Sequence, residues 1–419
     1  MTLLLIIVVL LLILFGAPIF AIISGLALFL LFSSQIDSSA MIIEMYRIAT
    51  TPILVAIPLF TFSGYLLSES GTPKRLIRLS NAILGWLPGG LSIIALFTCA
   101  IFTALTGATG LTIIALGGIL FPAMLQGRYP EKFSLGLLTT SGTLGLLFPP
   151  SLPLIIYAIV AKVGIDQLFL AGILPGILLV ILLSAFSIQK ATFSEIPRTK
   201  FNVSEVFKAL VEMIWELPLP IVVLGGIYSG YFVVSEAAAI TAIYVLIIEV
   251  VIYRDIKWRE LPQIMRKSMV LVGGVLIIFG AALGLTNYLI DEEIPMKMLD
   301  FFKAHITSPF VFLVVLNFFL LAVGCIMGIF SALTVVIPLI TPIAHAYGIH
   351  PIHLGIIFLT NLEIGASIPP LGINLFISSI RFEKPVLRLY LASLPFIAIL
   401  LVGLAIITYI PWLSLALLK

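Results

Sequence analysis

The stretch "GLLFPPSLPLIIY" (145–157) places two adjacent prolines, and a third proline three residues later, inside a long apolar run. Proline has no N–H, so it leaves the carbonyl four residues earlier without its helical partner. Pro149 and Pro150 are therefore predicted to free the carbonyls of Gly145 and Leu146. In lipid, such irregular backbone persists only around a cavity, water or an ion. The break predicts oxygen ligands for a hard cation such as Na⁺; the alternative is a kink healed by a neighbouring Ser or Thr.

A second pair of prolines stands in the text "IPPLGINL" (368–375). Pro369 and Pro370 are predicted to free the carbonyls of Gly365 and Ala366 in the same way. The first freed position is a glycine in both stretches, where an unusual backbone angle has little cost. Two breaks of one kind favour a functional role for the carbonyls over an isolated kink.

The composition is that of a polytopic helical membrane protein. Of the 419 residues, 61% are hydrophobic and 10% are charged, and the mean hydropathy is +1.27. Apolar runs of spanning length follow one another, and about ten full spans are predicted. The first run, 2–32, is too long for the apolar core of a signal peptide and is interpreted as one or two mature helices. The predicted full spans are 2–15, 18–32, 51–68, 134–162, 168–188, 217–232, 235–252, 269–290, 352–380 and 390–412.

The prolines also reveal an internal repeat. Six prolines of the first half have counterparts in the second half at offsets of 220 to 222 residues. Five full spans are predicted between the first proline of each set, and this odd number gives the halves opposite orientation. Inverted repeats with helices broken near the midplane are a transporter design; a structural duplication without transport is the alternative. The matched pairs are Pro73 with Pro295, Pro88 with Pro309, Pro130 with Pro351, Pro149 with Pro369, Pro150 with Pro370, and Pro175 with Pro395.

The repeat of about 221 residues predicts a division into four parts. The N-terminal scaffold helices occupy 1–70 and the central scaffold helices occupy 191–290. Repeat one (71–190) and repeat two (291–419) each hold an arm, a re-entrant helical hairpin and a proline-broken helix. The predicted fold class is therefore all-α and polytopic, with two hairpins and two broken helices.

The two hairpins are predicted in 89–125 and 308–347. In the first, "ALTGATGLT" (104–112) places small and hydroxyl residues between two apolar arms. In the second, the matching tip is "CIMGIFSALT" (325–334), with Gly328 in place of Gly107. The second arm begins at such a tip, and the positive end of its dipole suits a carboxylate. The alternative for the first tip is a helix-packing motif of small residues. The residues of that tip are Thr106, Gly107, Ala108 and Thr109.

Polar residues beside the breaks are candidates for the substrate site. Glu363 lies just before the second break, where an acid at membrane depth is a functional candidate or a partner for the broken helix. Asn361 and Asn374 flank the same break and would stabilise the loop or line the pocket. The full set of substrate-binding candidates is Ala108, Thr143, Ser151, Ser367, Asn361 and Asn374.

The distribution of charge predicts the topology. The net charge is +3, and 17 of the 22 Lys and Arg residues fall in five connections. These connections lie on one side if each hairpin enters and leaves by the same face, and the positive-inside rule makes that side cytoplasmic. Both termini are then outside, unless the first apolar run is a single helix.

Several functions are excluded or disfavoured by what the sequence lacks. It has no Walker A motif, no GxSxG elbow and no Rossmann fingerprint, so ATP-driven pumping within this chain and enzymatic activity are not expected. The two cysteines, Cys99 and Cys325, have no metal-binding spacing and are interpreted as buried free thiols.

Six segments together resemble the large membrane subunit of tripartite ATP-independent periplasmic (TRAP) transporters, the dicarboxylate-type M subunit. The resemblance covers almost the whole chain. It implies a sodium-coupled importer with an elevator mechanism in the bacterial or archaeal cytoplasmic membrane. It also implies two partners, a small four-helix membrane subunit and a periplasmic substrate-binding protein that delivers an organic acid, usually a carboxylate. The segments are "IPLFTFSGYLLSESGTPKRL", "WLPGGL", "GLLFPPSLPLIIY", "SEAAAI", "TNLEIGASIPPLGINLF" and "LASLPF".

The resemblance also implies sodium sites between each hairpin tip and the following broken helix. Three positions depart from the family pattern: Thr112 stands where many relatives carry aspartate, Gly328 where many carry an acid, and Ile368 where many carry threonine. The second ion site is thus expected to have fewer side-chain oxygens. The implied sodium ligands are Thr106, Gly107, Thr109, Gly145 and Leu146 in one half, and Gly328, Ser331, Gly365, Ala366 and Pro369 in the other.

Three other interpretations stay open. One is a stand-alone sodium–carboxylate symporter of the related hairpin superfamily, which needs no binding protein. Another is a membrane scaffold that transports nothing, and the third is an intramembrane protease, which the lack of a catalytic pair disfavours.

Overall fold

The structure, a computed structural model, describes residues 12, 17–193 and 201–418. Within these residues it is helical and contains no strand. The predicted first span, 2–15, lies almost wholly outside the described residues. Two adjacent-proline peptide bonds, Pro149–Pro150 and Pro369–Pro370, are cis.

Seven helices of the described part are long and apolar enough to cross a membrane, and two bent helix pairs raise the number to nine. The predicted multi-pass helical class is therefore confirmed. Each arm of the second predicted hairpin is 18 residues long and passes this test by itself, whereas the arms of the first are shorter. The seven helices are Pro52–Glu69 (η1 with α4), α11 (Ile165–Phe193), Val234–Ile252 (α14 with η3), α15 (Leu261–Asp291), α17 (Pro309–Ile326), α18 (Ile329–Ala346) and α21 (Val386–Tyr409).

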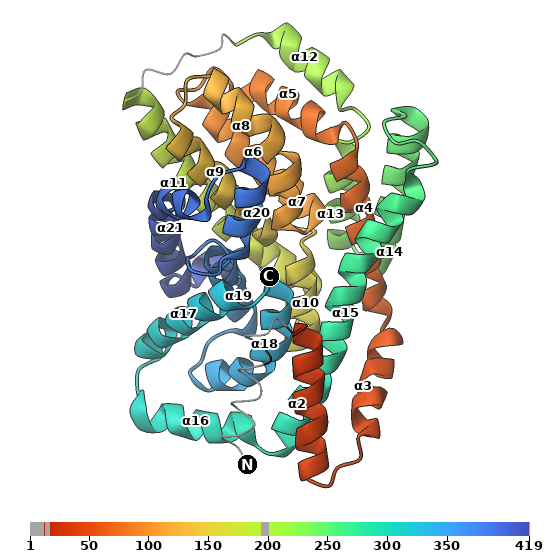
Figure 1. Ribbon diagram of the computed structural model, residues 1–419, viewed down its shortest axis with the longest axis vertical. Helices are drawn as coiled ribbons and strands as arrows, with labels where there is room; N and C mark the ends of the chain where they lie inside the picture. The colour runs from red at the N-terminus through yellow and green to blue at the C-terminus, as the bar shows by residue number, and fades with distance from the viewer. Residues whose placement is uncertain (1–11, 13–16, 194–200, 419) are drawn as a thin grey trace.

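Both halves of the chain contain the same order of elements: a short arm, a helix pair, a helix interrupted at a proline pair, and a long helix (Figure 1). Elements α5 to α9 occupy the upper half of the view, and α16 to α18 the lower half. The inverted relation between the halves stays a prediction, as does the four-part division. The further elements of the two series are α5 (Thr72–Leu84), α6 (Gly90–Thr106), α7 (Thr109–Ala115), α8 (Gly117–Gln126), α9 (Glu131–Ser141), η2 (Gly142–Leu147) and α10 (Leu152–Ala161), then α16 (Ile294–His305), α19 (Pro351–Gly365) and α20 (Ile373–Phe382).

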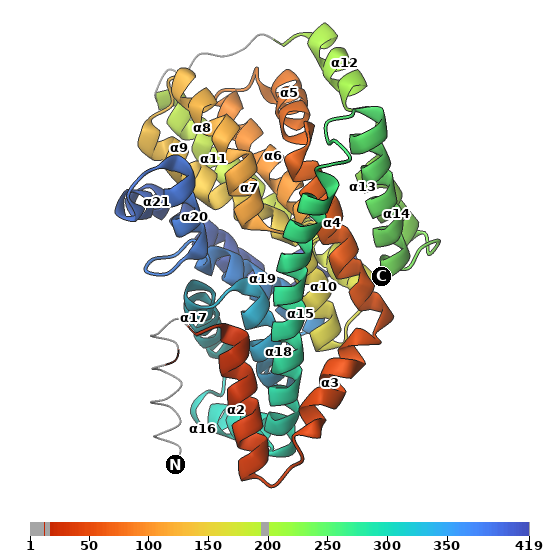
Figure 2. The same ribbon diagram turned by 45° about the vertical axis from the view of Figure 1, so that its right-hand side comes forward.

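The two halves of the chain contact each other at the broken helices. Helix α20, which follows the second break, packs against α7 of the first helix pair, and α10, which follows the first break, packs against α18 of the second pair. Within each half, the first arm of the pair packs on the segment before the break, α6 on η2 and α17 on α19. Three segments beside the breaks, η2, α10 and α19, also contact one another, and Figure 2 shows α10 and α19 in the middle part of the molecule.

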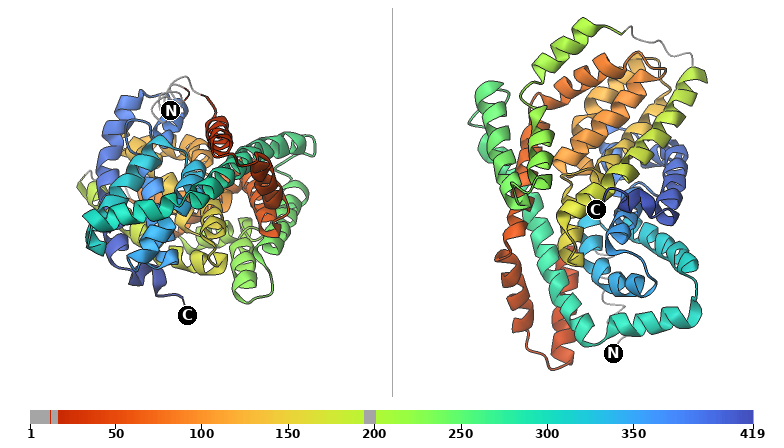
Figure 3. Two further views of the ribbon diagram at one scale, coloured as in Figure 1. Left: turned by 90° about the horizontal axis from the view of Figure 1, so that it is seen from below. Right: turned by 180° about the vertical axis from the view of Figure 1, so that it is seen from behind.

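Most of the remaining helices lie along one side of this interior. The long α15 contacts α4 and the two N-terminal helices, and α14 packs on α4. Seen from behind, α12 lies at the end of the molecule beside α5 (Figure 3). These helices are α2 (Ile19–Ser33), α3 (Ser39–Ala49), α12 (Val203–Glu212) and α13 (Pro218–Tyr228). The short C-terminal α22 (Trp412–Leu415) packs instead against α11 and α19.

Candidate ion and substrate site

The first predicted tip coincides with the break between α6 and α7. Helix α6 ends at Thr106, Gly107 adopts a left-handed conformation with φ of 68°, and α7 begins at Thr109. A Cβ on Gly107 would also lie 2.7 Å from the side chain of Leu152, the first residue of α10. Glycine is therefore required both by the turn and by the contact of the tip with the segment after the first break.

The first break differs from its prediction in two ways. The Gly145 carbonyl is not left unpaired, because the N–H of Phe148 donates to it over 3.1 Å in a tighter, 3₁₀-like turn. Position 145 also does not require glycine for its backbone angles, because its φ is not positive. A Cβ there would lie 2.3 Å from the carbonyl oxygen of Ala100, so the glycine lets η2 approach α6 closely. The Leu146 carbonyl receives no N–H from positions 149 and 150, because both are proline.

The second break shows the same corrections. The N–H of Ile368 donates to the Gly365 carbonyl over 2.9 Å, and the N–H of Asn374 donates to the Ala366 carbonyl over 3.0 Å. A Cβ on Gly365 would lie 2.8 Å from the backbone of Gly324, so this glycine again serves a close helix contact. Each carbonyl oxygen has two lone pairs and keeps one for a further ligand. The prolines thus redirect the carbonyls rather than leaving all four of them unpaired.

The structure joins three separately predicted residues into one buried polar bridge. The Thr109 hydroxyl donates to the Asn374 side-chain oxygen over 2.9 Å, and the Asn374 amide donates to the Ser367 hydroxyl over 3.2 Å. All three side chains are buried. The bridge connects the first tip with both sides of the second break, so polar groups from the two halves share one place.

Two further predicted hydroxyls are buried without a hydrogen-bond partner in the described part of the chain: those of Thr106 and Ser151. Thr106 is next to Gly107 in the chain, Ser151 is next to Leu152, and Gly107 lies against Leu152. Both hydroxyls are therefore placed where the first tip meets the first break. Buried polar groups normally find a partner, and an unpartnered hydroxyl marks a place for a ligand or water. Thr143 differs, because its hydroxyl donates to the Thr140 carbonyl within its own helix over 2.8 Å.

The remaining candidates lie around the second break. The Asn361 amide donates to the side-chain oxygen of Asn317 on α17 over 2.7 Å, so it stabilises a helix contact rather than the bridge. Glu363 is buried, with one carboxyl oxygen unpartnered in the described residues. Near the second tip, the Cys325 thiol donates to the Ile368 carbonyl over 3.3 Å. Of the other candidates, Ala108 is half-buried in the first tip, Gly328 lies in the open second tip, Ser331 is buried in the first turn of α18, and Pro369 is half-buried in the break.

Sequence reasoning missed several buried polar contacts. The hydroxyls of Thr103 and Thr112 meet over 2.6 Å and close the base of the first tip, and Asn317 also donates to Thr408 over 3.2 Å. The nine-residue interval from Thr103 to Thr112 becomes informative only once the tip between them is known. Asn317 gives no such signal, because its partners are 44 and 91 residues away.

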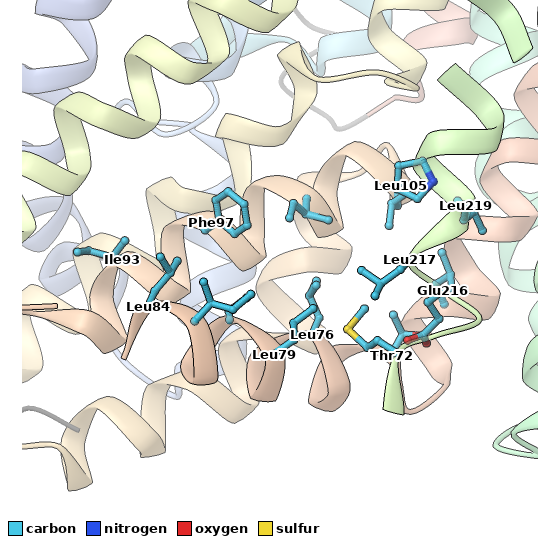
Figure 4. A pocket seen from close by; sticks show the side chains of 16 residues that line it. Thr72, Leu76, Leu79, Leu84, Ile93, Phe97, Leu105, Glu216, Leu217 and Leu219 are labelled. Carbon is cyan, nitrogen blue, oxygen red and sulfur yellow. The ribbon is translucent and has the colours of Figure 1, made fainter. Parts of the chain in front are cut away.

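Two cavities border the first helix pair and have an apolar lining. One, of about 420 Å³, lies between α5, α6 and α13 (Figure 4), and another, of about 350 Å³, reaches Phe148 and Pro149. Almost all of their lining is apolar, so neither suits an organic acid. No group of three or more His, Cys, Asp or Glu residues that could hold a metal occurs among the described residues.

These features define a polytopic membrane protein whose interrupted helices meet at a buried polar region. The description "Tripartite ATP-independent periplasmic transporter, DctM component" belongs to the family profile that matches residues 4–413. The chain is a member of this family, and the predicted resemblance is confirmed.

Individual relatives agree with this assignment. The chain is 37% identical to the C4-dicarboxylate TRAP transporter large permease protein DctM of Pseudomonas aeruginosa over 395 residues, 94% of this chain and 92% of the relative. It is 30% identical to the sialic acid TRAP transporter large permease protein SiaM of Vibrio cholerae, over 87% of this chain and 86% of the relative. The YdaH transporter of Alcanivorax borkumensis shares the fold, with a TM-score of 0.63 and 16% identity over 90% of this chain and 88% of that one.

Proposed function

We propose that this protein imports a small organic acid, in particular a carboxylate, by sodium-coupled secondary transport in the cytoplasmic membrane. Relatives are named for C4-dicarboxylates and for sialic acid, both of which are organic acids. The observation that carries the sodium part is the set of buried oxygens at the tips and breaks. Hydroxyl and carbonyl oxygens replace the hydration shell of an alkali cation, and the Thr106 hydroxyl has no other partner among the described residues.

The proposed ion sites keep the residues expected from the sequence. The first uses the hydroxyls of Thr106 and Thr109 and the backbone around Gly107, Gly145 and Leu146. The second uses the Ser331 hydroxyl and backbone oxygens. These belong to Gly328, Gly365, Ala366 and Pro369. The Thr109–Asn374–Ser367 bridge supports coupling between the halves, because a ligand at the first tip changes a contact to the second break.

The substrate is proposed to bind between the two breaks. Ser151, Ser367 and Asn374 supply donors for a carboxylate there. An elevator movement would carry the helix pairs and broken helices past the N-terminal and central helices, with α5 and α16 as the connecting arms. We further propose a small four-helix membrane subunit and a periplasmic binding protein as partners, because the relatives are named large permeases of TRAP transporters.

Uptake into proteoliposomes tests this function. With both partner subunits present, we expect uptake that needs a sodium gradient, is not replaced by potassium and requires no ATP. The purified chain alone is expected to transport little or nothing. Equal uptake by the single chain would favour the stand-alone symporter, and the absence of sodium-dependent uptake in every combination would contradict the proposal.

Removing the Thr109 hydroxyl should affect transport more than removing the Thr143 hydroxyl. Thr109→Val keeps the shape but leaves the buried Asn374 oxygen without its donor, at a cost of about 1–3 kcal/mol. Thr143→Val removes only a hydroxyl that bonds within its own helix. We expect Thr109→Val to raise the half-saturating sodium concentration about tenfold or more, and Thr143→Val to leave it unchanged. Equal sodium curves for the two variants would remove Thr109 from the ion site.

The orientation is tested by labelling single cysteines in a background without Cys99 and Cys325. The connection that contains Arg259 is proposed to face the cytoplasm, and both termini the opposite side. A cysteine at position 259, which is exposed, should react with an impermeant reagent only after the cells are permeabilised. Labelling in intact cells would reverse the proposed topology.

A further inference from the structure

Arg75 lies at the centre of a buried ionic cluster that plays no part in the site described above. Its guanidinium contacts three carboxylates: Glu216 at 2.7 Å, Glu249 at 3.1 Å and Asp255 at 2.6 Å. It also stacks 3.9 Å from the ring centre of Tyr253. The Arg75 side chain is 9% exposed, and those of Glu216 and Glu249 are 5% and 0% exposed.

The cluster joins the arm α5 to the central helices. Arg75 is in the first turn of α5, Glu216 lies two residues before α13, and Glu249 lies in η3 (Ile247–Ile252), a π-helical end of α14. Such π-helical turns occur often at functional sites. Asp255 follows η3 and also accepts the N–H of Gly71 over 2.9 Å, just before α5 begins.

The charges hold Arg75 in its ionised form. Burial by itself lowers the pKa of Arg75, but hydrogen bonds and charges from Glu216, Asp255 and Glu249 outweigh it and raise the pKa above its ordinary value. Thr72 adds to the network, because its hydroxyl lies 2.6 Å from Glu216 and 3.1 Å from Glu249. The attachment thus consists of several charge-assisted contacts, which are the stronger class of hydrogen bond.

Apolar packing is incomplete beside the cluster. The cavity of about 420 Å³ separates α5 and α6 from α13, and Figure 4 shows Thr72 and Glu216 at one of its ends. Leu76 and Leu217 face this cavity, so they have fewer neighbours across the interface than a closed core would supply. The ionic cluster therefore supplies a polar connection at a place where this apolar packing is incomplete.

We propose that Arg75 is a positioning residue for transport that anchors α5 to the central helices. This rests on the function proposed above. The anchor fixes the arm at one end while the helix pair beyond it moves. Its loss should slow the conformational step without altering the ion and substrate sites, since none of their residues contacts the cluster.

The test measures initial uptake by the full transporter against sodium and substrate concentration. Arg75→Gln with Glu249→Gln removes one charge of each sign, so no new charge imbalance remains. We expect the maximum rate to fall about tenfold or more, with both half-saturating concentrations within about twofold of the wild type. Arg75→Lys, which keeps the charge but loses the bidentate fork, should give an intermediate rate.

Arg78→Gln is the matched control. Arg78 is on the same arm, 48% exposed, and pairs with Glu212 at 2.7 Å and Glu205 at 3.4 Å on α12, so its replacement should leave the rate near normal. A wild-type rate in the folded double variant, or a changed half-saturation at an unchanged rate, would overturn the anchor.

A second measurement tests the attachment of α5 to the central helices independently of transport. Amide hydrogen exchange in residues 72–84 should speed up in Arg75→Lys and not in Arg78→Gln, even if the double variant does not fold. Equal exchange in the two single variants would also overturn the anchor. Wild-type protein without sodium-dependent uptake would overturn the proposed function, while faster exchange in Arg75→Lys would still support the attachment.

Discussion

Replacing Pro149 and Pro150 together by alanine should abolish sodium-dependent uptake while leaving the protein folded. The change supplies two N–H donors to the carbonyls of Gly145 and Leu146. Each interior proline disfavours a helix by about 3 kcal/mol, so η2 should continue into α10 and reduce the 45° bend between these segments. Continuing the helix should turn both carbonyls along its axis and away from the ion; if each is worth about 1.4 kcal/mol as a ligand, sodium binding weakens about a hundredfold.

The matched control is Pro175→Ala. Pro175 also interrupts the hydrogen bonds of a spanning helix, but it lies inside the continuous α11 rather than at a break. Uptake should then keep its normal sodium dependence. The readouts are the initial rate against sodium concentration and a thermal-unfolding scan. A well-folded double variant with unchanged sodium dependence would show that the prolines only bend the helix.

The positions of the tips and breaks could be predicted because they depend on local chemistry. Proline removes a donor wherever it stands, and glycine permits the left-handed turn seen at Gly107. The sequence also predicted Thr106 and Thr109 as sodium ligands and Ser151 as a substrate-binding residue, and all three hydroxyl side chains are buried. What these residues bind stays a prediction.

Contacts between distant segments were not predicted, because nothing in the local pattern encodes them. The pairing of the Asn361 amide with Asn317, 44 residues away, is one such contact. Arg75 was counted only as one of the basic residues that set the topology, whereas its partners lie 141 to 180 residues away. The reason for glycine at position 145 was also predicted wrongly. Glycine is required there because the backbone of α6 lies too close for a Cβ atom, and not because of the backbone angles of residue 145.

Gly145→Ala should destabilise the protein and stop transport, whereas Gly328→Ala should do neither. Both glycines are proposed to offer a carbonyl to sodium, and alanine keeps that carbonyl in both. A Cβ on Gly145 would lie 2.3 Å from the Ala100 oxygen and 2.8 Å from the Ala104 nitrogen, and these backbone atoms move only if α6 and η2 separate. A Cβ on Gly328 would meet no atom within 4 Å.

The difference between the two variants separates packing from ion binding. Overpacking at Gly145 should cost about 1–3 kcal/mol and displace the first tip from the first break, so uptake falls together with the unfolding temperature. Gly328→Ala should stay within about 0.5 kcal/mol of the wild type and keep its uptake. Gly365→Ala should resemble Gly145→Ala, because its Cβ would lie 2.8 Å from the Gly324 backbone. Equal stability of all three variants would contradict the close helix contacts at both breaks. Loss of uptake in a stable Gly328→Ala variant would mean that the added methyl group lies against the substrate or the ion.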